Sequence, residues 1–192
     1  MPVAPGETID VERTRAKLVR GATELFYRDG VAVSVEEIAR RAATSKLTVY
    51  RHFGDKEGLL EEVLRQRSDR VVDWLSAAAD RPTDPLDQLV AVFDALHGWY
   101  AEHQFRGCAI VNAATQAPVQ AGSARRIAGE HLARLRALLT RLAAQAGAPD
   151  ADLAGRQLLI LLEGATVVAA ITRERGAALD ARALVGSVVG GD

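Results

Sequence analysis

Five side chains between residues 46 and 52 carry chemistry that is used to recognise nucleic acids: Lys46, Leu47, Thr48, Arg51 and His52. Lys46 and Arg51 can donate hydrogen bonds to guanine edges or to phosphates. Thr48 offers a hydroxyl group to a phosphate or a methyl group to thymine, and Leu47 offers an apolar contact to a thymine methyl. His52 is informative only together with its neighbours. Such side chains read bases only from the free face of a helix that lies in a DNA groove.

Two short helices joined by a tight turn are predicted to position these side chains. Ser34 and Glu37 fit the S-x-x-E capping box that opens a helix. Ser45 can cap a second helix, Val49 lies on its apolar side, and Gly54 ends it. Both helices are too short to be stable alone, and the second is polar and basic on its free face. This pattern predicts a helix-turn-helix whose second helix enters the DNA major groove.

Basic residues gather around this motif although the whole chain is nearly neutral. The net charge is −1, and the stretch 40–56 holds one acidic residue, Asp55, against five basic residues, Arg40, Arg41, Lys46, Arg51 and Lys56. A confined basic patch on a neutral chain favours a specific DNA reader over a general nucleic-acid coat. Without the helix-turn-helix pattern, a solvated charged face would be the simpler interpretation. Backbone N–H groups at the helix starts Ser34, Ser45 and Asp55 offer further phosphate contacts.

The composition is typical of an all-α protein. Hydrophobic residues make up 48% of the 192 residues and aromatic residues 5%. The single cysteine, Cys108, excludes an intrachain disulfide framework. The first ten residues lack the basic start and apolar run of a signal peptide, and no stretch approaches the ~18 uninterrupted apolar residues of a membrane span. We therefore expect a cytoplasmic protein.

About nine helices and no strand are predicted, in two domains. Residues 1–9 are expected to be disordered, residues 10–54 to form the DNA-binding domain, and residues 55–192 to form a ligand-binding and dimerisation domain. The clearest loop is the helix-breaking cluster at residues 80–85. Outside the helix-turn-helix motif, the expected helices cover residues 10–28, 55–79, 86–103, 108–114, 121–146, 153–173 and 179–189.

Catalytic and metal-binding motifs are absent from the sequence. It has no H-E-x-x-H, no G-x-S-x-G, no phosphate-binding glycine loop and no paired cysteine ligands. Its four histidines, at positions 52, 97, 103 and 131, lack metal-ligand spacing. We therefore expect no enzyme activity, no metal and no cofactor.

The run from Leu18 to Leu60 resembles the N-terminal DNA-binding domain of TetR-family transcriptional regulators. The matching motifs are A-x-x-L-F at residues 22–26, Gly30, S-V-x-E-I-A at 34–39, S-K-x-T-V-Y-R-H-F at 45–53 and D-K-E at 55–57. The resemblance implies that Thr48, Tyr50 and His52 lie near the DNA backbone and that Lys56 contacts a phosphate. It also implies a homodimer that places two recognition helices about 34–36 Å apart on a palindromic operator in double-stranded DNA.

This chain departs from the family pattern in two places. Ala43 and Thr44 stand in the turn where Gly-Val is usual, and Leu47 stands where a small residue, often Gly, is usual. Ala43 is expected to strain a turn that prefers a positive φ. Leu47 is expected either to touch DNA or to shift the helix in the groove. Tyr50 has two interpretations as well, a DNA contact or a core ring with only its hydroxyl group at the surface.

The resemblance implies a C-terminal domain that binds a small molecule, and its residues are assigned from type and spacing. Phe93, His97 and Tyr100 follow i, i+4, i+7 and share a helix face that lines either an apolar ligand cavity or an aromatic core. Cys108 and Asn112 belong to a segment that looks like the helix near the ligand cavity in many family members. Cys108 is alternatively a redox sensor or a buried apolar filler.

Residues 158–173, within the expected helix 153–173, are apolar on most of the helix circumference, as expected of a helix packed both on its own bundle and on a second subunit. Glu163 within it is a ligand contact, an interface pair or a rim residue. We expect a repressor that leaves its operator when an inducer favours a state with wrongly spaced reading helices, with the helix from Asp55 as the lever. Activation, corepression and a ligand-free architectural role remain alternatives.

Overall fold

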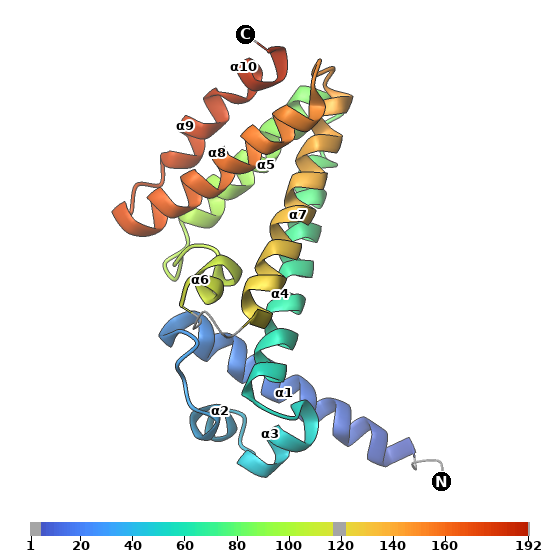
Figure 1. Ribbon diagram of the computed structural model, residues 1–192, viewed down its shortest axis with the longest axis vertical. Coiled ribbons are helices and arrows are strands. Elements are labelled where there is room, and N and C mark those ends of the chain that lie inside the picture. The colour runs from blue at the N-terminus through green and yellow to red at the C-terminus, as the bar shows by residue number, and fades with distance from the viewer. Residues whose placement is uncertain (1–4, 117–121, 192) are drawn as a thin grey trace. The chain divides into compact units, whose positions relative to one another are not determined.

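The computed structural model describes residues 5–116 and 122–191, and these residues form helices and no strand (Figure 1). This result confirms the predicted all-α class. Ten helices are described, one more than the nine expected, because the expected helix 179–189 is divided at Leu184. The first helix begins at Pro5 rather than at residue 10, so the expected N-terminal disorder is wrong for residues 5–9. The same expectation for residues 1–4 lies outside the described residues.

The chain folds into two compact units. The N-terminal unit comprises residues 1–67 and 109–127, and the C-terminal unit comprises residues 68–108 and 128–192. Two of the three boundaries fall inside long helices, α4 (Lys56–Ala79) and α7 (Gly122–Gln145), and the third lies directly before Ala109. The predicted boundary at residue 54 divides the chain by what each part binds, and the two units divide it by how it packs. The functional boundary therefore stays a prediction.

In the N-terminal unit, α1 (Pro5–Asp29) packs on α2 (Val35–Arg41), and α2 packs on α3 (Lys46–Phe53). The short helix α6 (Ala109–Gln116) also contacts α1. Gly30 ends α1 with a φ of +82°, a conformation that glycine adopts without strain. The core of this unit is built from the apolar stripe of α1 and its partners, Leu18, Val19, Ala22, Leu25, Phe26, Ile38, Val49 and Leu59.

The C-terminal unit contains α5 (Pro85–Tyr100), α8 (Ala151–Thr172), α9 (Ala177–Ala183) and α10 (Val185–Gly190), together with most of α7 and the second half of α4. Helix starts follow local chemistry. Asp84 accepts hydrogen bonds from the first turn of α5, with Pro85 at the first helical position, and Asp150 caps α8 in the same way.

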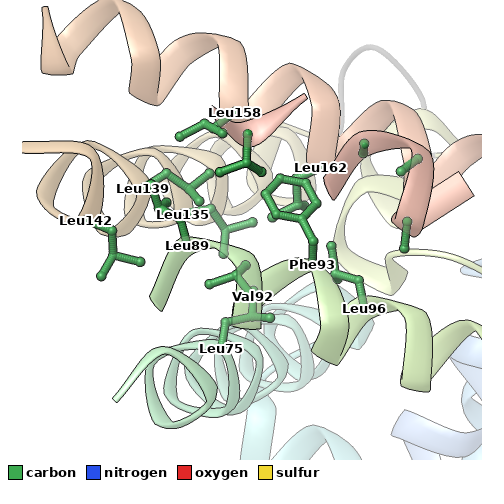
Figure 2. Packing of buried hydrophobic residues seen from close by; sticks show 14 of the residues in the cluster. Leu75, Leu89, Val92, Phe93, Leu96, Leu135, Leu139, Leu142, Leu158 and Leu162 are labelled. Atoms are coloured by element: carbon green, nitrogen blue, oxygen red, sulfur yellow. The ribbon is translucent and has the colours of Figure 1, made fainter. Parts of the chain in front are cut away.

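Leucine side chains from α4, α5, α7 and α8 form one buried cluster with Phe93 and Val92 in the core of this unit (Figure 2). Phe93 is completely buried. Burial of each large apolar side chain stabilises the folded chain by about 1.5–3 kcal/mol, so this cluster is the main source of the unit's stability. The labelled members are Leu75, Leu89, Val92, Phe93, Leu96, Leu135, Leu139, Leu142, Leu158 and Leu162.

The helix α8 is the one described helix that is long and apolar enough to cross a membrane by length and composition alone. The sequence alone predicts no membrane span here, because Glu163 interrupts the apolar run. Of the 18-residue window that passes the test, 39% is buried inside the protein. Core helices of folded bundles meet the same criterion, and α8 supplies Leu158 and Leu162 to the core.

Candidate functional site

The capping box predicted at the start of α2 is confirmed. The Glu37 backbone N–H donates to Ser34 Oγ at 3.2 Å, and the Ser34 backbone N–H donates to Glu37 Oε2 at 3.1 Å. The hydrogen bonds that the Ser34 backbone N–H and, next, the Ser34 hydroxyl donate to the Glu37 carboxylate lower the pKa of this carboxyl. The reciprocal pair fixes the first turn of α2 and thereby the start of the helix-turn-helix.

The turn between α2 and α3 has the backbone strain expected from its sequence. Ala43 has a φ of +53°, in the left-handed region where a Cβ is unfavourable. The turn is closed by hydrogen bonds from the Ala43 N–H to the Arg40 carbonyl at 3.1 Å and from the Thr44 N–H to the Ala39 carbonyl at 2.9 Å. The fold therefore tolerates alanine at this position, but at a cost of about 1–2 kcal/mol.

The recognition helix α3 is capped by Ser45, whose Oγ accepts from the Thr48 backbone N–H at 3.1 Å and bonds the Thr48 hydroxyl at 2.8 Å. Val49 is the buried residue of this helix. Leu47 is 67% exposed, Tyr50 is 38% exposed and Arg51 is exposed. The structure thus presents on the surface the helix face that the sequence assigned to DNA, and it favours the surface interpretation of Tyr50.

Lys46, the first residue of α3, is engaged with its own domain. Its Nζ donates to Glu36 Oε1 on α2 and lies 5.7 Å from the centre of the Tyr50 ring. The hydrogen bond and the negative charge of Glu36 raise the pKa of Lys46. Because both partners are exposed, this pair can open when a phosphate competes for the ammonium group.

The other predicted DNA contacts lie at helix ends of the same unit. Ser34 caps α2 and is half-buried. His52 is half-buried near the end of α3, with its ring 6.1 Å from that of Phe53. Lys56 begins α4, and partial burial lowers the pKa of its ammonium group. All nine predicted DNA contacts therefore fall in the N-terminal unit, on or beside the helix-turn-helix.

The predicted ligand residues differ in how deeply they are buried and in the unit to which they belong. Phe93 is fully buried in the packed core. Tyr100 is buried as well, and its hydroxyl lies 2.7 Å from the Thr166 hydroxyl. Because Thr166 donates its own proton to the Leu162 carbonyl at 2.8 Å, Tyr100 is the donor to Thr166. Burial raises the pKa of Tyr100 to about 12. His97 makes a hydrogen bond of 3.0 Å between its Nδ1 and the Arg175 carbonyl.

Glu163 lies on α8 and is largely buried. Burial raises the pKa of its carboxyl group to about 7, and its charge acts on Tyr100. Asn112 is placed differently from the other predicted ligand residues, because it belongs to α6 in the N-terminal unit.

Cys108 lies beside a buried group of hydrogen-bonded polar side chains that was not predicted from the sequence. His131 is 1% exposed, with Nε2 3.9 Å from Cys108 Sγ and Nδ1 3.0 Å from Ser68 Oγ. Arg134 Nη1 donates to the same Ser68 hydroxyl at 3.0 Å. Burial, and next the nearby Arg134 charge, lower the pKa of His131 to about 4, so the imidazole is neutral at pH 7.

Two of the buried polar residues that were not predicted, His131 and Thr166, have a signal in the sequence. His131 stands four residues after Ile127 and four before Leu135, so helical periodicity places it on the apolar face of α7. Thr166 likewise follows Leu162 by four residues. The sequence signal of these buried polar pairs is therefore a polar residue at a position where helical periodicity expects an apolar one.

Comparisons with known proteins agree on the class of this fold. Residues 18–63 match the family model described as bacterial regulatory proteins, tetR family. Two curated relatives from Mycolicibacterium smegmatis are similar: the HTH-type transcriptional activator FasR, 31% identical over 107 residues, and the HTH-type transcriptional repressor KstR2, 32% identical over 94 residues. These matches cover 55% and 48% of this chain, and they span only about half of the relatives, 48% of FasR and 46% of KstR2.

A solved structure extends the similarity over nearly the whole chain. The proposed TetR-type transcriptional regulator sav143 from Streptomyces avermitilis is 30% identical and superposes with a TM-score of 0.83, over 93% of this chain and 97% of that protein. These relatives are regulators and not enzymes, as the sequence led us to expect. The chain therefore belongs to the TetR family of bacterial regulatory proteins.

Proposed function

We propose that this chain is a cytoplasmic transcriptional repressor that binds a palindromic operator as a homodimer and is released by a small-molecule inducer. The observation that carries the DNA-binding part is the free face of α3. A capped helix of eight residues, anchored by Val49, exposes Leu47 and Arg51 in the position that a groove-reading helix requires.

The DNA-contacting side chains divide into two groups in this proposal. Lys46, Leu47 and Arg51 face the base edges, because they occupy the exposed side of the recognition helix. Ser34, Ser45, Thr48, Tyr50, His52 and Lys56 contact the DNA backbone. Backbone contacts fix the position of the protein on DNA, whereas base contacts select the sequence.

An exposed apolar strip on α8 supports the homodimer. Ile160 is 70% exposed, Val167 is 54% exposed and Ile171 is 79% exposed. Their spacing of seven and four residues puts them on one side of the helix, and Gly164 between them permits close approach of a second helix. Beside this strip, α8 and α10 enclose an open groove of 580 Å³ that includes Leu153, Ile160, Leu161, Leu184 and Val188. A contiguous apolar surface of this kind is typical of a subunit interface.

The buried polar groups of the C-terminal unit support an effector site. Glu163, Tyr100, His97 and Cys108 are its proposed ligand contacts, whereas Asn112 on α6 belongs to the N-terminal unit and stays a separate prediction from the sequence. Phe93 is proposed to support the site from the core, since its ring is fully buried. A carboxylate and hydroxyl groups among aromatic rings give an apolar ligand a few polar anchors. The rings of Trp99 and Phe105, 4.8 Å apart, belong to the same aromatic group.

The two relatives differ in the sign of regulation, since KstR2 is named a repressor and FasR an activator. Repression is proposed for this chain because it needs only competition for the operator, whereas activation also needs a contact with the transcription machinery. The helix α4, which continues from one unit into the other, is the proposed lever.

A salt-controlled selection of random duplex DNA by the purified protein tests this function. We expect a palindrome with half-sites one helical turn apart, and a dimer by light scattering. Replacement of Ile171 by Glu should give a monomer that loses the palindrome. A reporter driven from the selected operator then distinguishes repression from activation. Weak, sequence-independent binding by the wild-type protein would contradict the proposal.

A further inference from the structure

The orientation of the recognition helix depends on few buried contacts. Within α3, Val49 is the buried residue, while the remaining side chains are exposed or half-buried. The N-terminal end of α3 is tied to α2 through the pair of Lys46 and Glu36. One buried valine and one exposed ion pair leave the helix free to tilt about Val49 unless its other end is also held.

Arg15 of α1 holds that other end through three simultaneous contacts. Its Nη1 donates to the His52 backbone carbonyl at 3.1 Å. Its guanidinium carbon lies 4.5 Å from the centre of the Phe53 ring. Its Nη2 forms an ion pair of 3.0 Å with Glu62 Oε2 on α4. His52 and Phe53 are the last two residues of α3, so a single side chain connects α1, the C-terminal end of α3 and α4.

The chemistry of each contact suits a guanidinium group in this place. The carbonyl of His52 lies in the last turn of α3, where helix carbonyls lack partners within the helix and where the helix dipole favours a cation. The planar guanidinium can lie over an aromatic ring while its edge donates hydrogen bonds in two directions. A lysine ammonium has no planar face to lie on the ring while its N–H groups donate sideways in two fixed directions, so lysine is not an equivalent replacement.

We propose that Arg15 is a positioning residue for DNA reading: it sets the tilt of α3 and contacts no phosphate. Each of its two terminal nitrogen atoms uses one N–H donor within the N-terminal unit, Nη1 toward His52 and Nη2 toward Glu62. The inference rests on the proposed function, since a tilt of α3 matters only if this helix reads DNA. Base contacts are sensitive to tilt, whereas contacts to a uniform phosphate backbone tolerate it.

The test compares Arg15→Lys and Arg15→Met with the wild-type chain and with the control Arg13→Met, which changes an exposed arginine on the same helix. The dissociation constants for the selected operator and for an unrelated duplex are measured over a range of salt concentrations. We expect both Arg15 variants to bind the operator about tenfold more weakly, the loss of one charge-assisted hydrogen bond. Affinity for the unrelated duplex and the salt slope should stay unchanged.

One further variant tests the role of Arg15, and two results would overturn it. Glu62→Gln removes the ion pair alone and should weaken operator binding about twofold. A phosphate contact would instead lower the salt slope by about 0.9, weaken both duplexes and tolerate lysine, and this result overturns the inference. Loss of thermal stability with unchanged operator affinity of the folded protein also overturns it. If the wild-type protein selects no operator, the proposed function itself fails.

Discussion

The side-chain oxygen of Gln116 accepts a hydrogen bond of 3.3 Å from the backbone N–H of Val31. Gln116 is the last residue of α6, and Val31 lies in the segment between α1 and α2. The contact therefore joins the end of α6 to the entrance of the helix-turn-helix, within the N-terminal unit. Gly30 beside it has a φ of +82°, and a Cβ built there would lie 2.5 Å from the same Gln116 oxygen.

We predict that Gly30→Ala and Gln116→Ala are coupled. Gly30→Ala should reduce the free energy of unfolding by about 1–2 kcal/mol, because it places a Cβ at positive φ and displaces the Gln116 side chain. Gln116→Ala alone should reduce it by about 0.5–1 kcal/mol. Since either change breaks the bond to Val31, the double variant should lose about 0.5–1 kcal/mol less than the sum. Urea unfolding followed by circular dichroism measures this cycle, and strict additivity would contradict the coupling.

Replacement of Ala43 by glycine should stabilise the protein. Alanine at a φ of +53° is strained by about 1–2 kcal/mol, and the greater freedom of glycine in the unfolded chain offsets part of the gain, so we expect a net increase of about 0.5–1 kcal/mol. Ala137→Gly is the matched control: Ala137 is exposed in the middle of α7, and its replacement should destabilise by about 1 kcal/mol. A loss of stability in Ala43→Gly would show that the turn does not prefer glycine.

Leu47 should recognise the 5-methyl group of a thymine. Uracil lacks only this methyl group, so replacing thymines of the selected operator by uracils one at a time probes the contact directly. At one position in each half-site we expect about a fourfold loss of affinity, the worth of one buried methyl group, and this loss should vanish in Leu47→Ala. Val11→Ala, another exposed apolar residue of the N-terminal unit, should keep the wild-type sensitivity. Equal uracil sensitivity in wild type and Leu47→Ala would rule out the contact.

The carboxyl of Glu163 should make stability depend on pH. Its pKa is about 7 in the folded protein against an ordinary value of 4.5, so the folded state binds the proton more tightly than the unfolded chain. A raised carboxyl pKa leaves stability intact below the unfolded value and removes it as pH rises through the folded value. Glu163→Gln should therefore unfold at a urea concentration close to that of wild type at pH 4.5.

The difference between the two proteins should then grow between pH 4.5 and 7 and reach about 1–3 kcal/mol in favour of Glu163→Gln at pH 8. Both proteins share every other titrating group, so the comparison isolates this carboxyl. Glu174→Gln, which changes an exposed glutamate after the same helix, serves as the control for the Glu-to-Gln replacement itself. A constant difference from pH 4.5 to 8 would mean that the Glu163 carboxyl does not titrate in this range.

Local chemistry made most helix starts predictable. Ser34 with Glu37, Ser45, Asp84 before Pro85, and Asp150 each cap a helix within two residues of the expected position. The break between α9 and α10 was not predictable, because it falls at Leu184, which is neither glycine nor proline, and the nearby Gly186 lies inside α10. Periodicity favours one helix there, and packing of both short helices into the core decides the break.

Site residues were predictable where their placement depends on spacing within one helix. They were not predictable where it depends on contacts between residues far apart in the sequence. The exposed face of α3 follows from spacing within eight residues. Spacing also places Phe93 and Tyr100 on one face, but it cannot tell a cavity wall from a packed core, and Phe93 proved to be core. Arg15 lies 37 residues from its partner His52, and nothing in the sequence distinguishes it from the solvated arginines of α1.

The shallow anchoring of α3 has a consequence for how new regulators arise. Because Val49 is the buried side chain of this helix, substitutions at its exposed positions would, under the proposed function, alter what is read without disturbing the hydrophobic core. Specificity and foldability are thus nearly independent properties at this surface. A duplicated copy of the gene can drift toward a different operator through folded intermediates, and a designer can exchange the exposed residues of α3 while keeping the rest of the chain unchanged.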